Sequence, residues 1–225
     1  MQIILTAGWE DGVADLTERL VRELAAGKQV LWLVSGGSNI PASAQIMDNI
    51  PHDLSHNLTV MLVDERYGKL GHEESNWAQL MSAGFHSDEA KLLPVLQAGL
   101  SFEQTIERYS EITKVALANN EIIIAQLGIG PDGHIAGILP DSLATKETND
   151  VAVGFRSTPF DRLTLTFEAL RKIDVAYTFA FGNTKRQALE SLESKSQGLI
   201  RQPSEILKEV SEAYVYNDQL GEHKK

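Results

Sequence analysis

Short, almost uninterrupted apolar runs alternate along this chain with segments whose apolar residues recur at helical spacing. Runs of strand length occur at 3–5, 30–34, 58–63, 122–127, 151–155, 163–166, 175–181 and 213–216. Helical stripes are formed by Val13, Leu16, Leu20 and Leu24 and by Phe102, Ile106, Tyr109, Ile112 and Ala116, and shorter helices are expected after Pro41, from Ser75 to Leu80, at 185–192 and at 204–210. Apolar strands separated by helices predict an α/β fold, a mainly parallel, doubly wound, Rossmann-like sheet with helices on both faces.

The chain has no internal repeat, low-complexity tract or long linker, so residues 1–225 are expected to form a single domain. It does not open with a basic segment followed by a long apolar stretch, and none of its apolar runs approaches the roughly 20 residues that span a bilayer. We therefore expect a cytoplasmic protein. Both a monomer and a homodimer are compatible with the sequence.

Charge and composition narrow the classes of partner. Lys and Arg total 20 against 31 Asp and Glu, a net charge of −11, which disfavours binding to nucleic acid or to anionic membranes because both need a basic surface. A few local cations and backbone N–H groups can still hold one phosphate. The chain has no cysteine, which excludes disulfides, thiolate metal sites and cysteine nucleophiles, so serine, histidine and carboxylates must carry any chemistry.

Ligands of parallel α/β sheets bind at the carboxyl ends of the strands, so the loops after the strands are the places to search. The first of these loops holds Ser35, Gly36, Gly37, Ser38 and Asn39, directly before a helix. Paired glycines allow backbone N–H groups to turn toward an anion, and the start of a helix adds partial positive charge. The loop is either a phosphate cradle or a plain tight turn, and the flanking hydroxyls favour the cradle.

A second loop begins with Asp64-Glu65-Arg66, three charges at the end of an apolar run. Strand alternation should send Asp64 and Arg66 to one side and Glu65 to the other. One interpretation is a solvated strand end. The other is a polar cleft that receives a carboxylate and a guanidinium suited to a bidentate phosphate contact.

The third loop, 128–134, matches the G-x-G-x-x-G dinucleotide pattern but lacks the sustained helix that this pattern requires, because Pro140 interrupts the segment after it. We therefore reject a dinucleotide site. What remains is His134 among glycines, including Gly130, and close to Asp132. That setting suits a general base oriented by a carboxylate.

Two further cations lie where they can reach a phosphate at the same edge of the sheet. Lys185 follows a strand and Gly182, and Arg162 directly precedes the run 163–166. Side chains of this kind are often only solvated, so for both Lys185 and Arg162 the alternative is a plain surface position.

Taken in order, the motifs Ser-Gly-Gly-Ser at 35–38, Asp-Glu-Arg at 64–66 followed by Ser-Asn at 75–76, and Gly-Ile-Gly-Pro-Asp-Gly-His at 128–134 resemble those of the 6-phosphogluconolactonases. The similarity continues through 162–166, 182–185 and 203–207 and spans almost the whole chain. That family shares a superfamily with the glucosamine-6-phosphate deaminases. Deaminases carry a catalytic glutamate five positions beyond the loop histidine, where this chain has Leu139, and they have Asp-Glu-Tyr where this chain has Asp-Glu-Arg.

The resemblance implies hydrolysis of 6-phospho-D-glucono-1,5-lactone to 6-phospho-D-gluconate, in the oxidative branch of the pentose phosphate pathway. His134 would activate water, with Asp132 or the neighbouring backbone fixing the ring, and the reaction would need no metal and no cofactor. Substrate and phosphate contacts are expected from Ser35, Gly36, Gly37, Ser38, Asn39, Asp64, Arg66, Asn76, Gly130, Arg162 and Lys185. The chain departs from the family pattern at Asn39, at Gly68 and at Ile135. A deaminase or isomerase acting on an amino-sugar phosphate and a non-catalytic sugar-phosphate binding protein are the alternatives.

Overall fold

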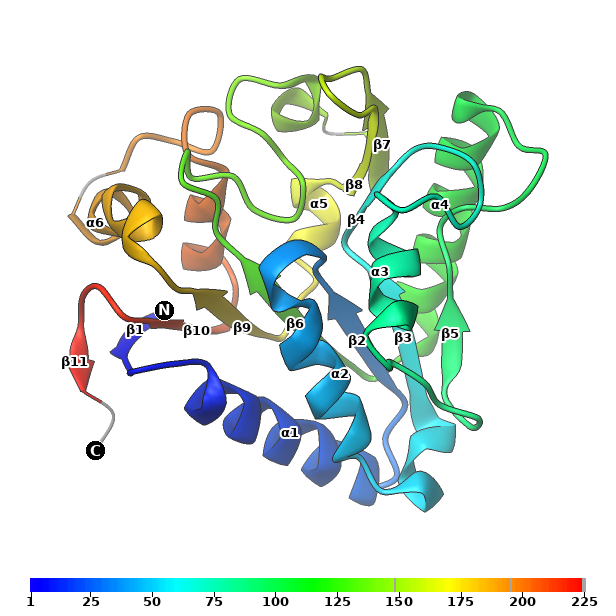
Figure 1. Ribbon diagram of the computed structural model, residues 1–225, viewed down its shortest axis with the longest axis horizontal. Coiled ribbons are helices and arrows are strands. Elements are labelled where there is room, and N and C mark those ends of the chain that lie inside the picture. The colour runs from blue at the N-terminus through cyan, green and yellow to red at the C-terminus, as the bar shows by residue number, and fades with distance from the viewer. Residues whose placement is uncertain (148, 195, 224–225) are drawn as a thin grey trace.

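A computed structural model describes residues 1–147, 149–194 and 196–223, and its centre is an eight-stranded sheet (Figure 1). The strands lie in the order β11-β1-β10-β9-β6-β2-β3-β5, and every neighbouring pair is parallel. Their bounds are β1 Gln2–Leu5, β2 Val30–Val34, β3 Leu58–Leu62, β5 Lys91–Leu93, β6 Ile122–Gly128, β9 Val175–Ala180, β10 Glu212–Asn217 and β11 Glu222–His223. All residues of β2, β3 and β9 are buried, which explains their continuous apolar sequences. The predicted α/β class is confirmed.

Helices cover both faces of this sheet. The α-helices are α1 Glu10–Ala25, α2 Ile40–Asp48, α3 Asn76–Ser82, α4 Phe102–Asn119, α5 Phe167–Leu170 and α6 Arg186–Ser194. Because parallel crossovers are right-handed, α1 and α2, which lead toward β3, share one face (Figure 1), whereas α4 and α6, which lead the opposite way, cover the other. The predicted stripe of α1 is buried, and the predicted cap Ser75 begins α3, its hydroxyl accepting a hydrogen bond from Ala78 N. No helix in the described part of the chain is long and apolar enough to cross a membrane.

Two of the predicted strands belong to a separate sheet. β7 (Ala152–Phe155) and β8 (Arg162–Leu165) pair antiparallel, and β8 pairs antiparallel with β4 (Asp64–Arg66). The connection between β7 and β8 has too few residues for the crossover that a parallel pair needs. Asp64, Arg66 and Arg162 belong to this small sheet, which places them near the carboxyl ends of the strands of the main sheet.

The predicted α-helix at 204–210 is instead the 3-10 helix η5, Pro203–Lys208. Its first turn is held by tertiary contacts, since Ser204 N donates to Gly133 O at 3.0 Å. The other short 3-10 helices are η1 Gly37–Asn39, η2 His52–Asn57, η3 Leu143–Lys146 and η4 Asn183–Lys185.

The strand order fixes where a ligand can bind. Crossovers from β2 proceed toward β5, and crossovers from β6 proceed toward β1, so the loops after these two adjacent strands diverge. Such a switch point leaves a crevice at the carboxyl ends of the strands. The loops that begin at Ser35 and at Ile129 flank it.

Candidate active site

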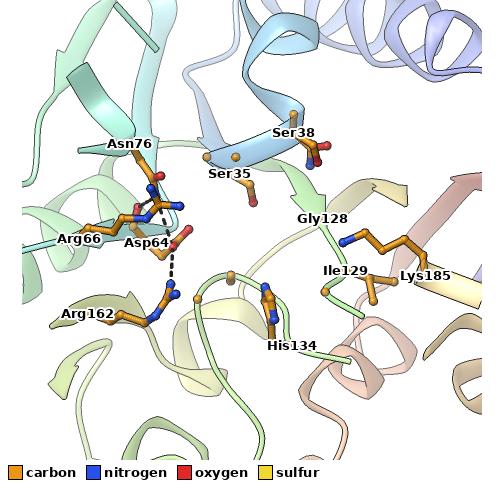
Figure 2. Close-up of a pocket in the computed structure, with 16 residues that line it drawn as sticks. Ser35, Ser38, Asp64, Arg66, Asn76, Gly128, Ile129, His134, Arg162 and Lys185 are labelled. Atoms are coloured by element: carbon orange, nitrogen blue, oxygen red, sulfur yellow. Dashed lines mark hydrogen bonds and ion pairs between the residues drawn. The ribbon is translucent and has the colours of Figure 1, made fainter. Parts of the chain in front are cut away.

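A pocket of about 250 Å³ lies at this switch point (Figure 2). It is lined by Ser35, Gly36, Gly37, Ser38, Asn39, Asp64, Arg66, Asn76, Gly128, Ile129, Gly130, His134, Ala136, Gly137, Arg162 and Lys185. The structure therefore brings together every substrate-contact residue named from the sequence, and His134 with them. Asp132 does not line the pocket, but its carboxylate contacts the Nδ1 atom of His134. Four further lining residues were not among the predicted contacts: Gly128 and Ile129, which belong to the motif at 128–134, and Ala136 and Gly137, which follow it.

The loop after β2 forms the upper wall of the pocket in Figure 2. Gly37 has a φ of 68°, a conformation that favours glycine, and it begins the 3-10 turn that leads into α2. Asn39 faces inward: its Nδ2 donates to Leu127 O at 2.9 Å, and Gln126 Nε2 donates to Asn39 O at 3.2 Å. Asn39 thus joins the loop after β2 to strand β6.

Strand β4 supplies another side of the pocket, on the left in Figure 2, where Asp64 and Arg66 lie. Asp64 and Arg66 point into the pocket while Glu65 is buried on the other side, so the predicted alternation is confirmed and a solvated strand end is wrong. Asn76 Nδ2 donates to Asp64 O at 3.1 Å and to Asp64 Oδ2 at 3.3 Å. Arg66 Nη1 donates to Glu74 Oε2 at 2.9 Å, a partner that the sequence analysis missed because it lies in an irregular loop.

Arg162 approaches Asp64 from β8, with Nη1 at 4.0 Å from Oδ2 (Figure 2). Burial raises the pKa of Asp64, and the charges of Arg162, His134 and Arg66 oppose that shift. This end of the pocket therefore combines two arginines with a buried carboxyl, so it presents both donors and an acceptor to a ligand.

His134 and Asp132 form a close pair. His134 Nδ1 lies 2.6 Å from Asp132 Oδ1, and hydrogen bonding to His134 lowers the pKa of Asp132 to about 2. An ionised carboxylate can only accept, so Nδ1 carries the proton and Nε2 of the neutral ring keeps its lone pair. Gly130 N donates to His134 O at 2.8 Å, and a Cβ at Gly130 would overlap the ring. The loop continues without a helix, as the rejection of a dinucleotide site required.

Lys185 enters the pocket from the other side, from η4 at the end of β9, and lies near Ile129 in Figure 2. Gly182 makes this turn with a φ of 97°. Burial lowers the pKa of Lys185, and the charge of Asp132 opposes this shift. Lys185 has no salt bridge to a carboxylate within the described residues, whereas Arg66 is paired with Glu74 and Arg162 lies beside Asp64.

Several buried polar atoms of the lining have no hydrogen-bond partner in the described part of the chain. They are Ser35 Oγ, Arg66 Nε and Asn76 Oδ1. Buried polar groups are normally paired, so a concentration of unpaired ones in one pocket is typical of a site that a polar ligand completes. Among the described residues, no cluster of three or more histidines and carboxylates is arranged to hold a metal ion.

At Gly36 the loop after β2 lies directly against Asn76, because a Cβ there would overlap the side-chain amide of Asn76. We expect Gly36→Ala to displace one wall and to weaken ligand binding by roughly tenfold, the equivalent of an overpacking cost of about 1–3 kcal/mol. The measurement is the dissociation constant, by calorimetry, of 6-phosphogluconate, the product that the sequence resemblance implies. Gly8→Ala is the control, since its Cβ would meet only the flexible side chain of exposed Glu10. Equal affinities for both variants would contradict the close approach.

Comparison with known proteins identifies the family. The model for glucosamine-6-phosphate isomerases/6-phosphogluconolactonase matches residues 8–215. The chain belongs to this family. Among its relatives is a 6-phosphogluconolactonase of Rhizobium meliloti, 28% identical over 190 residues that cover 80% of each chain. Another is the 6-phosphogluconolactonase of Pseudomonas aeruginosa, 27% identical over 187 residues, or 79% of this chain and 77% of the relative.

Solved structures of a lactonase and of a deaminase both share the fold of this chain. A 6-phosphogluconolactonase from Shewanella baltica superposes with a TM-score of 0.80 at 20% identity, covering 96% of this chain and 97% of that one. A monomeric glucosamine-6-phosphate deaminase superposes with a TM-score of 0.77 at 18% identity, again covering 96% and 97%. The fold is therefore that of the family, and the choice between its two activities depends on the site residues.

Proposed function

We propose that this chain hydrolyses 6-phospho-D-glucono-1,5-lactone to 6-phospho-D-gluconate. The observation that carries the proposal is the His134–Asp132 pair in a pocket that also contains three cations and a glycine-rich loop. The names of the curated relatives, 6-phosphogluconolactonases from several bacteria, support the same substrate. A lactone carbonyl is already electrophilic, so a positioned water, a base and a phosphate anchor meet the needs of the reaction.

In this mechanism His134 Nε2 takes a proton from a water molecule as the water oxygen attacks C1 of the lactone. The tetrahedral intermediate then collapses, the bond between C1 and the ring oxygen breaks, and the proton on His134 passes to the departing oxygen. Asp132 holds the ring through Nδ1 and stabilises the imidazolium that forms. The carboxylate product carries one proton fewer than the acid, so the reaction releases acid near neutral pH.

The phosphate group would be held by the loop 35–39 together with Lys185, Arg66 and Arg162. Backbone N–H groups near a helix start and cationic side chains are the usual donors to phosphate. Asp64 and Asn76 add acceptor atoms, which suit the hydroxyl groups of the sugar. Together these contacts would orient C1 toward His134.

The competing activity is deamination of an amino-sugar phosphate. Deaminases need a glutamate where this chain has Leu139, and Leu139 packs against the apolar core. The test is a parallel assay, with acid release from the lactone above its spontaneous hydrolysis and ammonia release from glucosamine 6-phosphate. Acid without ammonia is the expected result, and ammonia without acid would overturn the proposal in favour of the deaminase.

We further propose that the protein acts as a single domain in the cytoplasm, as a monomer or a homodimer, on a free small-molecule substrate and without a cofactor. Size-exclusion chromatography with light scattering measures the oligomeric state. A larger assembly would contradict this part of the proposal.

The low pKa of Asp132 leads to a prediction about pH dependence. This pKa is depressed to about 2, so folding favours the ionised carboxylate. The resulting stabilisation of the folded protein is complete above about pH 4 and is lost as the pH falls toward 2. Asp132 therefore does not titrate between pH 5 and 8. We expect Asp132→Asn to lower kcat, because the ring loses its anionic partner, and we expect any acid limb of wild-type kcat/KM in that range to persist in the variant. An acid limb that disappears in Asp132→Asn would assign it to this carboxyl.

A further inference from the structure

Glu65 is a buried carboxylate to which the mechanism gives no role. It is the central residue of β4, its side chain is fully buried, and it faces away from the pocket that its neighbours Asp64 and Arg66 line. No cation pairs with it among the described residues. A carboxylate in such a place is costly unless hydrogen bonds compensate for its burial.

Four donors provide that compensation, and their identity is informative. Oε1 accepts from Arg66 N and from Asn76 N, both at 2.7 Å. Oε2 accepts from Ser75 Oγ at 2.9 Å and from Trp77 N at 3.0 Å. A single oxygen of Glu65 therefore joins the main chain of two pocket residues that are ten positions apart in the sequence.

The position of Asn76 affects the rest of the wall. Its side-chain amide donates to Asp64 on one side and lies against Gly36 of the glycine-rich loop on the other. A shift of the Asn76 main chain would move this amide, and the overlap that a Cβ at Gly36 would cause shows how little room there is.

We propose that Glu65 is a positioning residue for substrate binding, which sets the separation of Arg66 and Asn76 through Oε1 without touching the substrate. The inference rests on the proposed function of this pocket. Among the described residues, no hydrogen bond or ion pair joins Glu65 to His134, whose partner is Asp132. Loss of the Glu65 bridge should therefore weaken binding and leave the chemical step intact.

A purely structural role would have a different signature. The two oxygens also cap the first turn of α3, beside the cap that Ser75 makes to Ala78 N. If capping were the whole role, variants would lose stability and part of the active enzyme, which lowers apparent kcat. The KM of the molecules that remain folded would not change. The separation of KM from kcat therefore distinguishes the two roles.

The test uses two variants of the full chain. Glu65→Asp keeps the charge but withdraws the carboxylate by about 1.5 Å, so that one oxygen no longer reaches both N–H groups. Glu65→Gln keeps the reach and one acceptor oxygen. We expect Glu65→Asp to raise the KM for the lactone and the Kd for 6-phosphogluconate by roughly tenfold, the loss of one hydrogen bond to a charged group. The Gln variant should show a smaller rise, and kcat per folded molecule should stay near that of the wild type.

Glu205→Asp is the matched control. Glu205 is also a buried carboxylate that accepts main-chain N–H groups, from Gln197 at 2.5 Å and Gly198 at 3.3 Å, but it is absent from the lining of the pocket. Its variant should lose stability with KM unchanged.

A double-mutant cycle supplies the second measurement. Arg66→Ala should raise KM less in the Glu65→Asp background than in the wild type, because the arginine is already displaced, whereas the effect of Lys185→Ala should be the same in both. Unchanged KM and Kd in Glu65→Asp, or an additive cycle with Arg66→Ala, would overturn the inference. If the wild type itself neither hydrolyses the lactone nor binds 6-phosphogluconate, it is the proposed function that fails.

Discussion

Replacing His134 with alanine is expected to lower kcat for lactone hydrolysis by about 10² or more, at the lower end of the range for general-base contributions. The reason is the geometry of the pair: Nδ1 is held by Asp132 at 2.6 Å, so Nε2 is the basic atom that faces the pocket. Alanine removes that atom and leaves the cations in place. The dissociation constant of 6-phosphogluconate should therefore change little.

The measurement is kcat at saturating lactone, corrected for spontaneous hydrolysis, together with calorimetric binding of the product. His56→Ala is the control, because His56 is exposed, does not line the pocket and has its ring Nδ1 2.8 Å from Asp53 O. An unchanged kcat in His134→Ala would remove the proposed base. A matching loss of product binding would mean instead that the substitution had disturbed the pocket.

Lys185→Ala is expected to have the opposite profile, a KM raised by roughly 10- to 100-fold with kcat little changed. A hydrogen bond to a charged group contributes about 1.5–3 kcal/mol, which corresponds to that range of affinity. Among the described residues that line the pocket, the two arginines have carboxyl groups as neighbours, whereas Lys185 has no salt bridge. Its charge is therefore the one most available to a phosphate.

Lys172→Ala is the matched control, because Lys172 is an exposed lysine that does not line the pocket. Lys185→Arg should recover part of the affinity because it restores the charge in a different shape. The assay is initial rate against lactone concentration. If kcat fell with KM unchanged, Lys185 would act in the chemical step and the assignment of a phosphate contact would be wrong.

The convergence of the pocket loops could be predicted because parallel strands end at the same edge of a sheet. Ser35 follows β2, Ile129 follows β6 and Gly182 follows β9, and these three strands are neighbours. Strand alternation correctly separated Asp64 and Arg66 from Glu65. The first inference rests on the common direction of parallel strands and the second on the alternation of side chains along a strand. Neither needs knowledge of the tertiary contacts.

Contacts made by irregular segments could not be predicted in this way. Glu74 pairs with Arg66 from a loop without periodicity, and the closeness of Asn76 to Gly36 depends on how α3 docks. The small antiparallel sheet was also missed, since the strand patterns at 151–155 and 163–166 do not reveal their partners. The bridge made by Glu65 belongs to the same class, because its partners at 75–77 are fixed by tertiary structure.

The most direct test of lactone hydrolysis by this chain is acid release from freshly generated 6-phosphogluconolactone, followed in a pH-stat against the spontaneous rate. We expect excess acid release that saturates with lactone and is proportional to the concentration of wild-type protein. No excess with the wild type, combined with a rise in melting temperature on addition of 6-phosphogluconate, would contradict it and identify a sugar-phosphate binding protein that does not catalyse hydrolysis.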